Sequence, residues 1–323
     1  MPLVTAAVVG PETPPPIDLP EVGYASVTYI DPAGNRWPMT DLAADWYTLA
    51  EGVSGLGAAP YTLTSDAHPR GGARLRHVQP QPRSIVWPVL VKGADHMVFT
   101  ANWRALATAF TRTLRLGSDG SRTAGVLEVA RPDGTRRTIE VYYSQGWDGQ
   151  GRTATGITWD SAVLTLWCED PYWVDSQAVV VHREYGVGAD FLVPYPTVSS
   201  SQVLGATTVT NPGDVDVWPT WTITGPASLI TFTRADTGDA FTLDPSDPDI
   251  GHGALLAGEQ VTIRTDPVQV RYQDGSNWVA GLDFPDAVLW SLPPGTTDVT
   301  FQLDGAGAGS AVDMTFNPKY ETA

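Results

Sequence analysis

The sequence predicts a mainly β protein, in which an N-terminal β domain with one helix precedes a C-terminal antiparallel β-sandwich. Composition is the first reason, because 32 glycines, 27 prolines and 12 tryptophans among 323 residues are typical of short strands joined by turns around aromatic cores. Periodicity is the second reason, because only one segment repeats its apolar residues at helical spacing, whereas short apolar runs recur elsewhere. The length suits about two domains.

Residues 1–21 are predicted to form an extended N-terminal arm. The arm contains Pro11, Pro14, Pro15, Pro16 and Pro20. Proline fixes φ and has no N–H to donate, so such a segment is extended rather than folded. It either frays as a chain terminus or docks on a neighbouring chain. It lacks the basic start of a signal peptide, and no apolar run in the chain reaches the ~20 residues of a membrane helix, so a soluble protein is expected.

The N-terminal domain is predicted over residues 22–176. It begins with a strand at 22–30, a turn around Gly34 and a return strand from Arg36. A glycine-rich loop follows at 47–60, and its spacing does not match the dinucleotide-binding fingerprint.

Two further strands and the helix come next. Strands are predicted at 71–76 and 84–91, and the alternation at residues 74–78 indicates one buried and one exposed face. The helix is predicted at 102–114, with Thr100 or Asn102 as its N-cap. Its apolar face consists of Trp103, Leu106, Ala107, Phe110 and Leu114.

The domain is predicted to close with three strands. A Pro-Asp-Gly turn joins strands at 125–130 and 136–143. The strand at 157–168 ends in Cys168, the single cysteine, whose apolar surroundings predict a core position and which excludes an internal disulfide. Regular pairing must stop or bulge at Pro171, because proline has no N–H for the ladder.

Residues 177–323 are predicted to form the sandwich, since short strands and turns alternate there without helical periodicity. Its strands are predicted at 178–182, 207–210, 221–224, 228–234, 240–243, 260–264, 268–272, 299–303 and 310–316. The net charge of −17 is concentrated in this part, which has 5 basic and 18 acidic residues against 14 and 18 in the rest. Such a surface repels DNA and RNA, so no sequence-specific nucleic acid partner is expected.

Several short motifs occur in order from about residue 24 to residue 320. They are Asp170-Pro171-Tyr172-Trp173 after a strand, Asn211-Pro212-Gly213 before Pro219, Leu292-Pro293-Pro294-Gly295 before a strand, and Pro318 near the end. Taken together, their order resembles the distal tail proteins of long-tailed bacteriophages. The residues marked by this resemblance as structural are Asp170, Pro171, Tyr172, Trp173, Asn211, Gly213, Pro219, Gly295 and Pro318.

The resemblance implies a structural virion protein at the tail tip, made in the cytoplasm of a host bacterium. The N-terminal domain would close into a hexameric ring, with a galectin-like sandwich outside it, and would connect the tail tube to the tail-tip and host-adsorption apparatus. The implied partners are other copies of the chain, the tail tube protein, the tape-measure protein and the tail-associated lysin-like hub protein, with receptor-binding proteins as a further candidate. The arm and the loop at 49–61 are the expected intersubunit contacts.

Catalytic, metal and cofactor sites find no support in the sequence. Histidines 68, 77, 96, 182 and 252 are scattered without zinc-ligand spacing, and no Gly-x-Ser-x-Gly elbow occurs. Residues 244–251 approach the spacing of a calcium loop, but prolines interrupt them and no glutamate closes the loop. A solvated turn is predicted there, with a weak cation site left open.

Two other functions stay open at this point. A carbohydrate-binding module for host cell-wall glycan would stack sugars on Trp218, Trp221, Trp278 or Trp290, although such tryptophans are more often core residues. A cell-wall hydrolase would need two carboxylates at a fixed separation, which depends on the fold rather than on sequence spacing.

Overall fold

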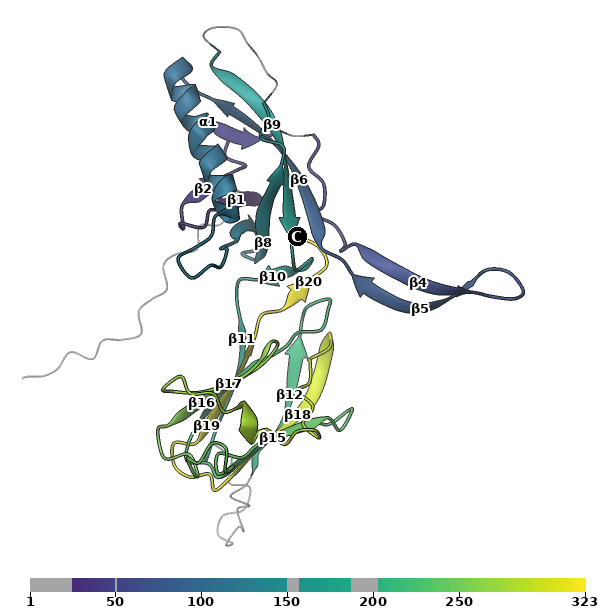
Figure 1. Cartoon of the computed structure of the whole chain (residues 1–323), viewed down its shortest axis with the longest axis vertical. Helices are drawn as coiled ribbons and strands as arrows, with labels where there is room; N and C mark the ends of the chain where they lie inside the picture. Colours follow the sequence, from purple (N-terminus) through teal and green to yellow (C-terminus); the bar gives the residue numbers. More distant parts are fainter. Residues whose placement is uncertain (1–24, 50, 150–156, 187–202) are drawn as a thin grey trace, which may run out of the picture. The chain divides into compact units, whose positions relative to one another are not determined.

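The structure is a computed structural model that describes residues 25–49, 51–149, 157–186 and 203–323 (Figure 1). The predicted arm lies outside the described residues. The chain divides into two compact units, the first comprising residues 1–53 and 86–166 and the second comprising residues 54–85 and 167–323. The boundary at residue 176 stays a prediction.

The first unit is built on a sheet with the strand order β2-β1-β7-β8-β9-β6-β3. Its strands are β1 Ser26–Ile30, β2 Arg36–Pro38, β3 Trp46–Thr48, β6 Arg83–Lys92, β7 Gly125–Ala130, β8 Arg136–Gln145 and β9 Trp159–Cys168. Both predicted hairpins are confirmed, because β1 pairs antiparallel with β2 and β7 pairs antiparallel with β8. β6 and β9 contribute residues to both units.

Helix α1, His96–Thr111, packs on the face of this sheet that carries Tyr29 (Figure 1). Tyr29 stacks on Phe110 with 4.4 Å between the ring centroids, and its hydroxyl donates to the carbonyl of Ala109 at 3.1 Å. Leu106 and Phe110, both predicted to face inward, are buried. A 3-10 turn, η1 Arg112–Leu114, continues the helix, and Leu114 is exposed rather than buried.

The predicted start of this helix is wrong. The N-cap is Asp95, whose carboxylate accepts a hydrogen bond from the backbone N–H of Val98 at 2.8 Å. Thr100 instead lies inside the helix, where its hydroxyl donates to the carbonyl of His96 at 2.7 Å. An aspartate at the N-cap satisfies an N–H that has no partner within the helix, so the first turn forms before the amphipathic pattern begins.

A separate hairpin precedes β6, formed by β4 Tyr61–Ala67 and β5 Ala73–Pro80 (Figure 1). The two strands pair only with each other, and every residue from 61 to 80 is exposed. The prediction of one buried face on β5 is therefore wrong for this chain. β4 is absent from the predicted strands.

The second unit contains the predicted antiparallel sandwich, whose two sheets have the orders β11-β19-β13-β16-β17 and β12-β18-β14-β15. Its strands are β11 Val179–Glu184, β12 Val203–Asn211, β13 Thr220–Thr224, β14 Leu229–Arg234, β15 Ala240–Leu243, β16 Gln260–Thr265, β17 Val268–Tyr272, β18 Gly295–Asp304 and β19 Ala311–Phe316. Each predicted strand of this part is confirmed. The core surrounds Trp221, which stacks on Phe232 at 4.4 Å between ring centroids.

Three short elements complete the second unit. β10 Trp173–Asp175 pairs antiparallel with β20 Lys319–Tyr320, and η2 Val279–Gly281 is a 3-10 turn in the sandwich. Among the residues that the structure describes, no helix has the length and apolar character needed to cross a bilayer.

Candidate functional site

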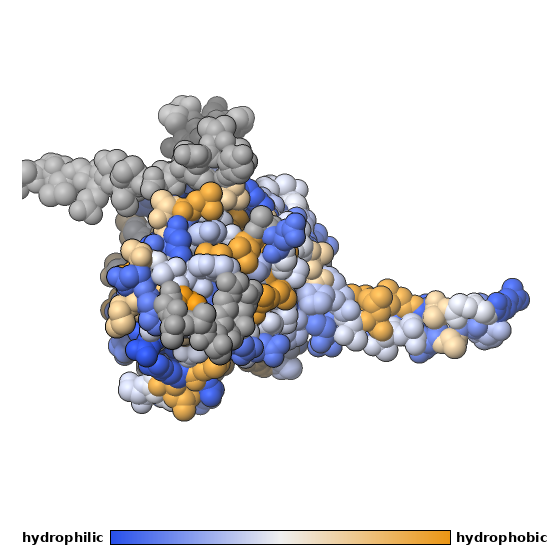
Figure 2. Space-filling model, turned by 90° about the horizontal axis from the view of Figure 1, so that it is seen from above, coloured by the Kyte–Doolittle hydropathy of each residue, from blue (hydrophilic) through white to orange (hydrophobic). Residues whose placement is uncertain are grey.

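The β4–β5 hairpin presents an uncovered apolar face. Leu63 pairs with Val78, and Leu75 pairs with Ser65 two positions further along β4, so the three apolar side chains share one face of the ribbon. Their exposed fractions are 63% for Leu63, 43% for Val78 and 53% for Leu75. Figure 2 shows apolar side chains on this ribbon near its base and polar ones at its tip. An isolated two-stranded hairpin is only marginally stable in water, so this face suits contact with another surface.

Charge distinguishes the hairpin from the rest of the chain. Residues 61–80 carry three arginines and one aspartate, whereas the whole chain has a net charge of −17. Arg76 forms an ion pair with Asp66 across the two strands. The two remaining arginines give the ribbon a positive surface that complements an acidic partner.

Arg83 anchors the base of the hairpin. Its side chain is buried, with Nη1 donating to the carbonyl oxygens of Gly55 and Gly57 at 2.9 and 2.6 Å. Nη2 donates to the carbonyl oxygen of Glu321 at 2.7 Å. Burial lowers the pKa of Arg83, but a guanidinium keeps its proton at any physiological pH. One charged group thus joins the loop before β4 to the C-terminal segment.

Glu321 holds the same loop from the other side. Its carboxylate accepts hydrogen bonds from the backbone N–H of Ala59 at 2.8 Å and from the hydroxyl of Tyr61. The Tyr61 hydroxyl also lies 3.3 Å from that of Tyr172. Burial and the hydrogen bond to Glu321 raise the pKa of Tyr61, so its phenol stays protonated and can donate. We call Arg83, Glu321 and Tyr61 the clamp.

The motif Asp170-Pro171-Tyr172-Trp173 borders the clamp. Lys319 donates from Nζ to Asp170 Oδ2 at 2.6 Å, and Asp170 Oδ1 accepts the backbone N–H of Tyr172 at 3.1 Å. Pro171 is buried, and Trp173 is fully buried at the start of β10. The motif therefore ends β9 and fixes the segment that pairs with β20.

Pro318 belongs to this region as well. It precedes β20, and its carbonyl accepts the backbone N–H of Asp175 at 2.9 Å. The neighbouring Asn317 donates from Nδ2 to the carbonyl of Asp175 at 2.8 Å. These contacts continue the β10–β20 pairing beyond its two paired residues.

Asn211, Gly213 and Gly295 lie on the other side of β20. The buried Asn211 side chain donates to two backbone carbonyls, each at 3.0 Å, and accepts from Gly213 N–H at 3.0 Å. Gly295 is opposite Asn211 in the β12–β18 ladder. A Cβ on Gly213 would lie 2.4 Å from the carbonyl oxygen of Lys319, so the close approach of β20 requires glycine.

Pro219 is placed elsewhere, at the start of β13. Its carbonyl accepts from the Thr265 hydroxyl at 2.7 Å within the sandwich. The structure thus brings eight of the nine motif residues to the region around β10 and β20 and leaves Pro219 apart. Their role as family residues stays a prediction.

Sequence reasoning missed Arg83, Glu321 and Tyr61. The available signal was an arginine at the first position of an otherwise apolar strand, because a charge beside a buried run needs several partners. The predicted contact loop at 49–61 overlaps the segment that the clamp holds. Whether it touches another subunit stays a prediction.

The Cys168 side chain is buried, as predicted. Burial raises the pKa of its thiol to about 12. A thiol with this pKa holds almost no thiolate at neutral pH, so Cys168 is a core residue rather than a nucleophile.

The four tryptophans considered for sugar stacking have different environments. Trp221, Trp278 and Trp290 are buried in the sandwich core, whereas Trp218 is 44% exposed. A sugar ring needs an open aromatic face. Of the four, only Trp218 offers one.

The carboxylates of residues 244–251 stabilise turns. Asp244 accepts from the N–H of Ser246 at 2.7 Å, and Asp247 accepts from the N–H of Asp249 at 2.8 Å. Throughout the described ranges, no three His, Cys, Asp or Glu side chains are grouped so as to hold a metal ion.

Comparison with solved structures shows what this arrangement resembles. The chain is similar to the SPP1 Dit protein, described as a paradigm of the hub adsorption apparatus in phages that infect Gram-positive bacteria, with a TM-score of 0.60 and 13% identity over 92% of this chain and 99% of that chain. This chain has a Dit-like fold. This chain is also similar to a chain of the phage p2 baseplate in its activated conformation with strontium (TM-score 0.52, 12% identity, 93% of this chain and 100% of that chain).

A second structure of that baseplate, in its activated conformation with calcium, contains a similar chain with a TM-score of 0.51 and 11% identity, covering 93% of this chain and 100% of that one. The fold expected from the order of the motifs is therefore confirmed. No family model matches the sequence, and no curated protein does either. The Dit-like fold was recognisable in three dimensions at identities where sequence comparison finds nothing.

Proposed function

We propose that this chain is a distal tail protein, a structural virion protein at the tail tip of a bacteriophage. It forms a hexameric ring that connects the tail tube to the tail-tip and host-adsorption apparatus. The observation that carries this proposal is the likeness to SPP1 Dit over 92% of this chain and 99% of that chain, since the match extends over both units and is not confined to one common β domain. The proposed partners are the tube, tape-measure and tail-associated lysin-like hub proteins, with receptor-binding proteins as a further candidate.

The hairpin supplies a physical reason for self-association. Leu63, Leu75 and Val78 on its apolar face are exposed among the residues that the structure describes, and its surplus of arginines suits the acidic surface of another copy. In a closed ring, the hairpin of each copy packs on the next copy, so the apolar face of every hairpin is covered. The clamp matters here because a ribbon held at its base loses less conformational freedom when it binds.

A structural role also fits the chemistry of the chain. The Cys168 thiol is buried and protonated, and two of the three carboxylates in residues 244–251, those of Asp244 and Asp247, accept hydrogen bonds within turns. We therefore propose no enzymatic activity. The alternative function, a carbohydrate-binding module, has less support because three of the four tryptophans named for it are buried.

Antibody labelling of the virus particle tests the proposed location. Gold-labelled antibodies raised against the purified chain should bind the end of the tail opposite the head. Binding only to the head, or to particles lacking a tail, would contradict the proposal. A pull-down on cell-wall glycan with the purified chain tests the alternative, which predicts retention that Trp218→Ala abolishes.

A further inference from the structure

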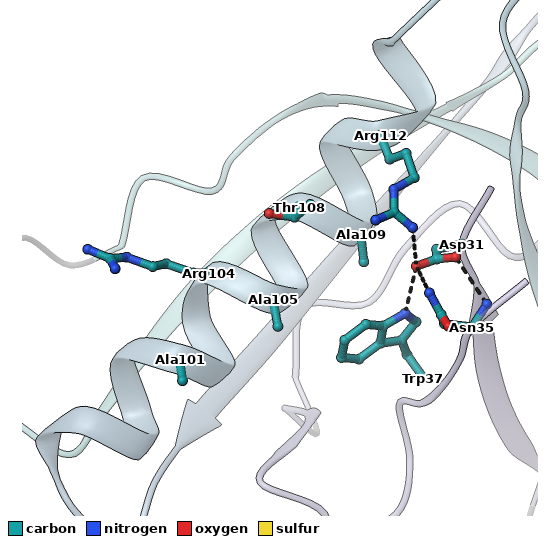
Figure 3. Close-up of a pocket in the computed structure, with 9 residues that line it drawn as sticks. All are labelled: Asp31, Asn35, Trp37, Ala101, Arg104, Ala105, Thr108, Ala109 and Arg112. Carbon is teal, nitrogen blue, oxygen red and sulfur yellow. Dashed lines mark hydrogen bonds and ion pairs between the residues drawn. The ribbon is translucent and has the colours of Figure 1, made fainter. Parts of the chain in front are cut away.

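A groove of about 410 Å³ crosses the first unit between helix α1 and the turn that joins β1 to β2 (Figure 3). Ala101 and Ala105 of α1 form one wall, and Trp37 of β2 lies across from them. Both alanines are exposed and Trp37 is half-buried. A slot between small side chains and an indole ring can accept an extended peptide.

The accessible charge of this groove is positive. The side chain of Asp31 is 1% exposed, and its carboxylate accepts from the backbone of Ala33 and Asn35 and from Arg112 Nη1 at 3.3 Å. Arg112 is 33% exposed. Arg104 is exposed and forms no ion pair with any residue in the described ranges. Figure 3 shows Arg112 turned toward Asp31 and Arg104 extending from the helix away from it; both arginines line the groove.

Residues 12–21 of the same chain have a complementary pattern. Four of the ten are proline, and residues 1–24 include no lysine, arginine or histidine. Proline-rich segments favour the polyproline II helix, which has about three residues per turn. Glu12, Asp18 and Glu21 are spaced by multiples of three, so in that helix they would share one face.

The spacing of the acidic residues in this segment is close to the spacing of the two arginines in the groove. Asp18 and Glu21 would be about 9 Å apart at a rise of ~3.1 Å per residue. Arg104 and Arg112 are about 12 Å apart along the helix axis at a rise of ~1.5 Å per residue. Long arginine side chains can bridge the difference between these two distances.

We propose that residues 12–21 of one copy dock in this groove on a neighbouring copy. Asp18 and Glu21 pair with Arg104 and Arg112, and the apolar faces of the segment pack against Trp37. This inference rests on the proposed ring. Within a ring the segment is held close to its groove, so even weak contacts are occupied because of the high effective concentration.

Chain length favours a neighbouring copy over the same copy. The segment enters the fold at Ser26, whereas the Asp31 end of the groove follows Ile30 at the opposite end of β1. To reach its own groove, the segment would have to reverse direction before Ser26 and run back along the length of β1. The residues between Glu21 and Ser26 span only about 17 Å when fully stretched, which is about the length of β1, so nothing is left for the reversal. A segment from the next copy has no such constraint.

Disulfide trapping in the full-length chain tests this docking. We would combine Pro20→Cys with Ala105→Cys in the groove wall and oxidise the assembled protein. Cys168 stays in place because its thiol is buried. The expected result is a ladder of covalent multimers on a non-reducing gel. The matched control pairs Pro20→Cys with Ser118→Cys, which is exposed in the same unit but outside the groove, and should give no ladder.

A charge exchange adds a second measurement. Arg104→Glu should lower the yield of the ladder about fivefold, and adding Asp18→Arg should restore it. The mass of each variant before oxidation is measured by light scattering. A ring without the ladder, or with equal ladders in test and control, would overturn the docking and leave the proposed ring intact. A disulfide that forms within single chains would overturn the docking of the segment on a neighbouring copy. A chain that never assembles would contradict the proposed ring and the docking together.

Discussion

Arg83 and Glu321 are 238 positions apart in the sequence, yet the guanidinium Nη2 of Arg83 donates to the main-chain carbonyl of Glu321 at 2.7 Å. The same arginine binds the carbonyls of Gly55 and Gly57. The last residues of the chain are therefore part of the support for the β4–β5 hairpin.

Arg83→Met should lower the free energy of unfolding of the second unit by about 3 kcal/mol, because three backbone carbonyls lose the buried, charged donor that they share. Urea denaturation measures this change. Arg76→Met is the matched control, since Arg76 is 53% exposed on the hairpin and an exposed ion pair contributes at most about 1 kcal/mol. Equal losses in the two variants would show that the clamp does not support this unit.

Gly213→Ala should lower the free energy of unfolding by about 2 kcal/mol, because its Cβ would lie 2.4 Å from the carbonyl oxygen of Lys319 and force β20 away. Gly57→Ala is the control, since a Cβ there meets nothing within 4 Å. Thermal unfolding of the two variants makes the comparison. A loss in Gly57→Ala as large as that in Gly213→Ala would contradict the steric explanation.

Asp31→Asn should change the dependence of stability on pH. Burial alone would raise the pKa of Asp31, but hydrogen bonds from Asn35, Ala33 and Trp37 outweigh it and lower the pKa below the ordinary value. The ionised carboxylate therefore stabilises the folded state above the unfolded pKa of ~3.9, and this contribution is lost as the pH falls through the folded pKa.

The variant should be less stable than the wild type by about 1–2 kcal/mol at neutral pH, and the gap should shrink below pH ~4. Urea denaturation across a pH series measures it, with Asp286→Asn, an exposed sandwich position, as control. A gap that stays constant down to the lowest pH would show that the charge of Asp31 is not what stabilises the fold.

Local signals account for the parts of the fold that the sequence predicted. The hairpin turn at Gly134 and the strand rhythm of the sandwich depend on neighbouring residues, so residue patterns suffice for them. The predicted start of α1 was wrong because Asp95 caps a first turn that has no amphipathic pattern of its own. β4 was not predicted because both its faces are exposed, and a strand without a buried face lacks the alternation of apolar and polar residues that marks a strand in sequence.

The clamp could not be predicted from local sequence patterns for a different reason. Arg83, Tyr61 and Glu321 come from distant parts of the chain, and their contacts depend on the position of Glu321 directly after β20, the strand that pairs with β10. In contrast, the motif at Asp170 was predictable because Pro171 interrupts a strand at a fixed place. Sequence patterns located that interruption, whereas only the fold revealed that Lys319 binds Asp170.

The mass of the assembled chain tests the ring most directly. Light scattering during size-exclusion chromatography should give about 208 kDa for the wild type, as six chains of 34.6 kDa require. The variant Leu63→Ser/Val78→Ser removes two of the three apolar side chains on the apolar face of the hairpin, and Thr62→Ser/Gln79→Ser changes the opposite face of the same ribbon as its control. If the apolar face of the hairpin holds the ring together, the first variant elutes as a single chain of 34.6 kDa and the control keeps the mass of the wild type. A wild type that stays at the mass of one chain at every concentration, or a ring that survives the loss of Leu63 and Val78, would contradict it.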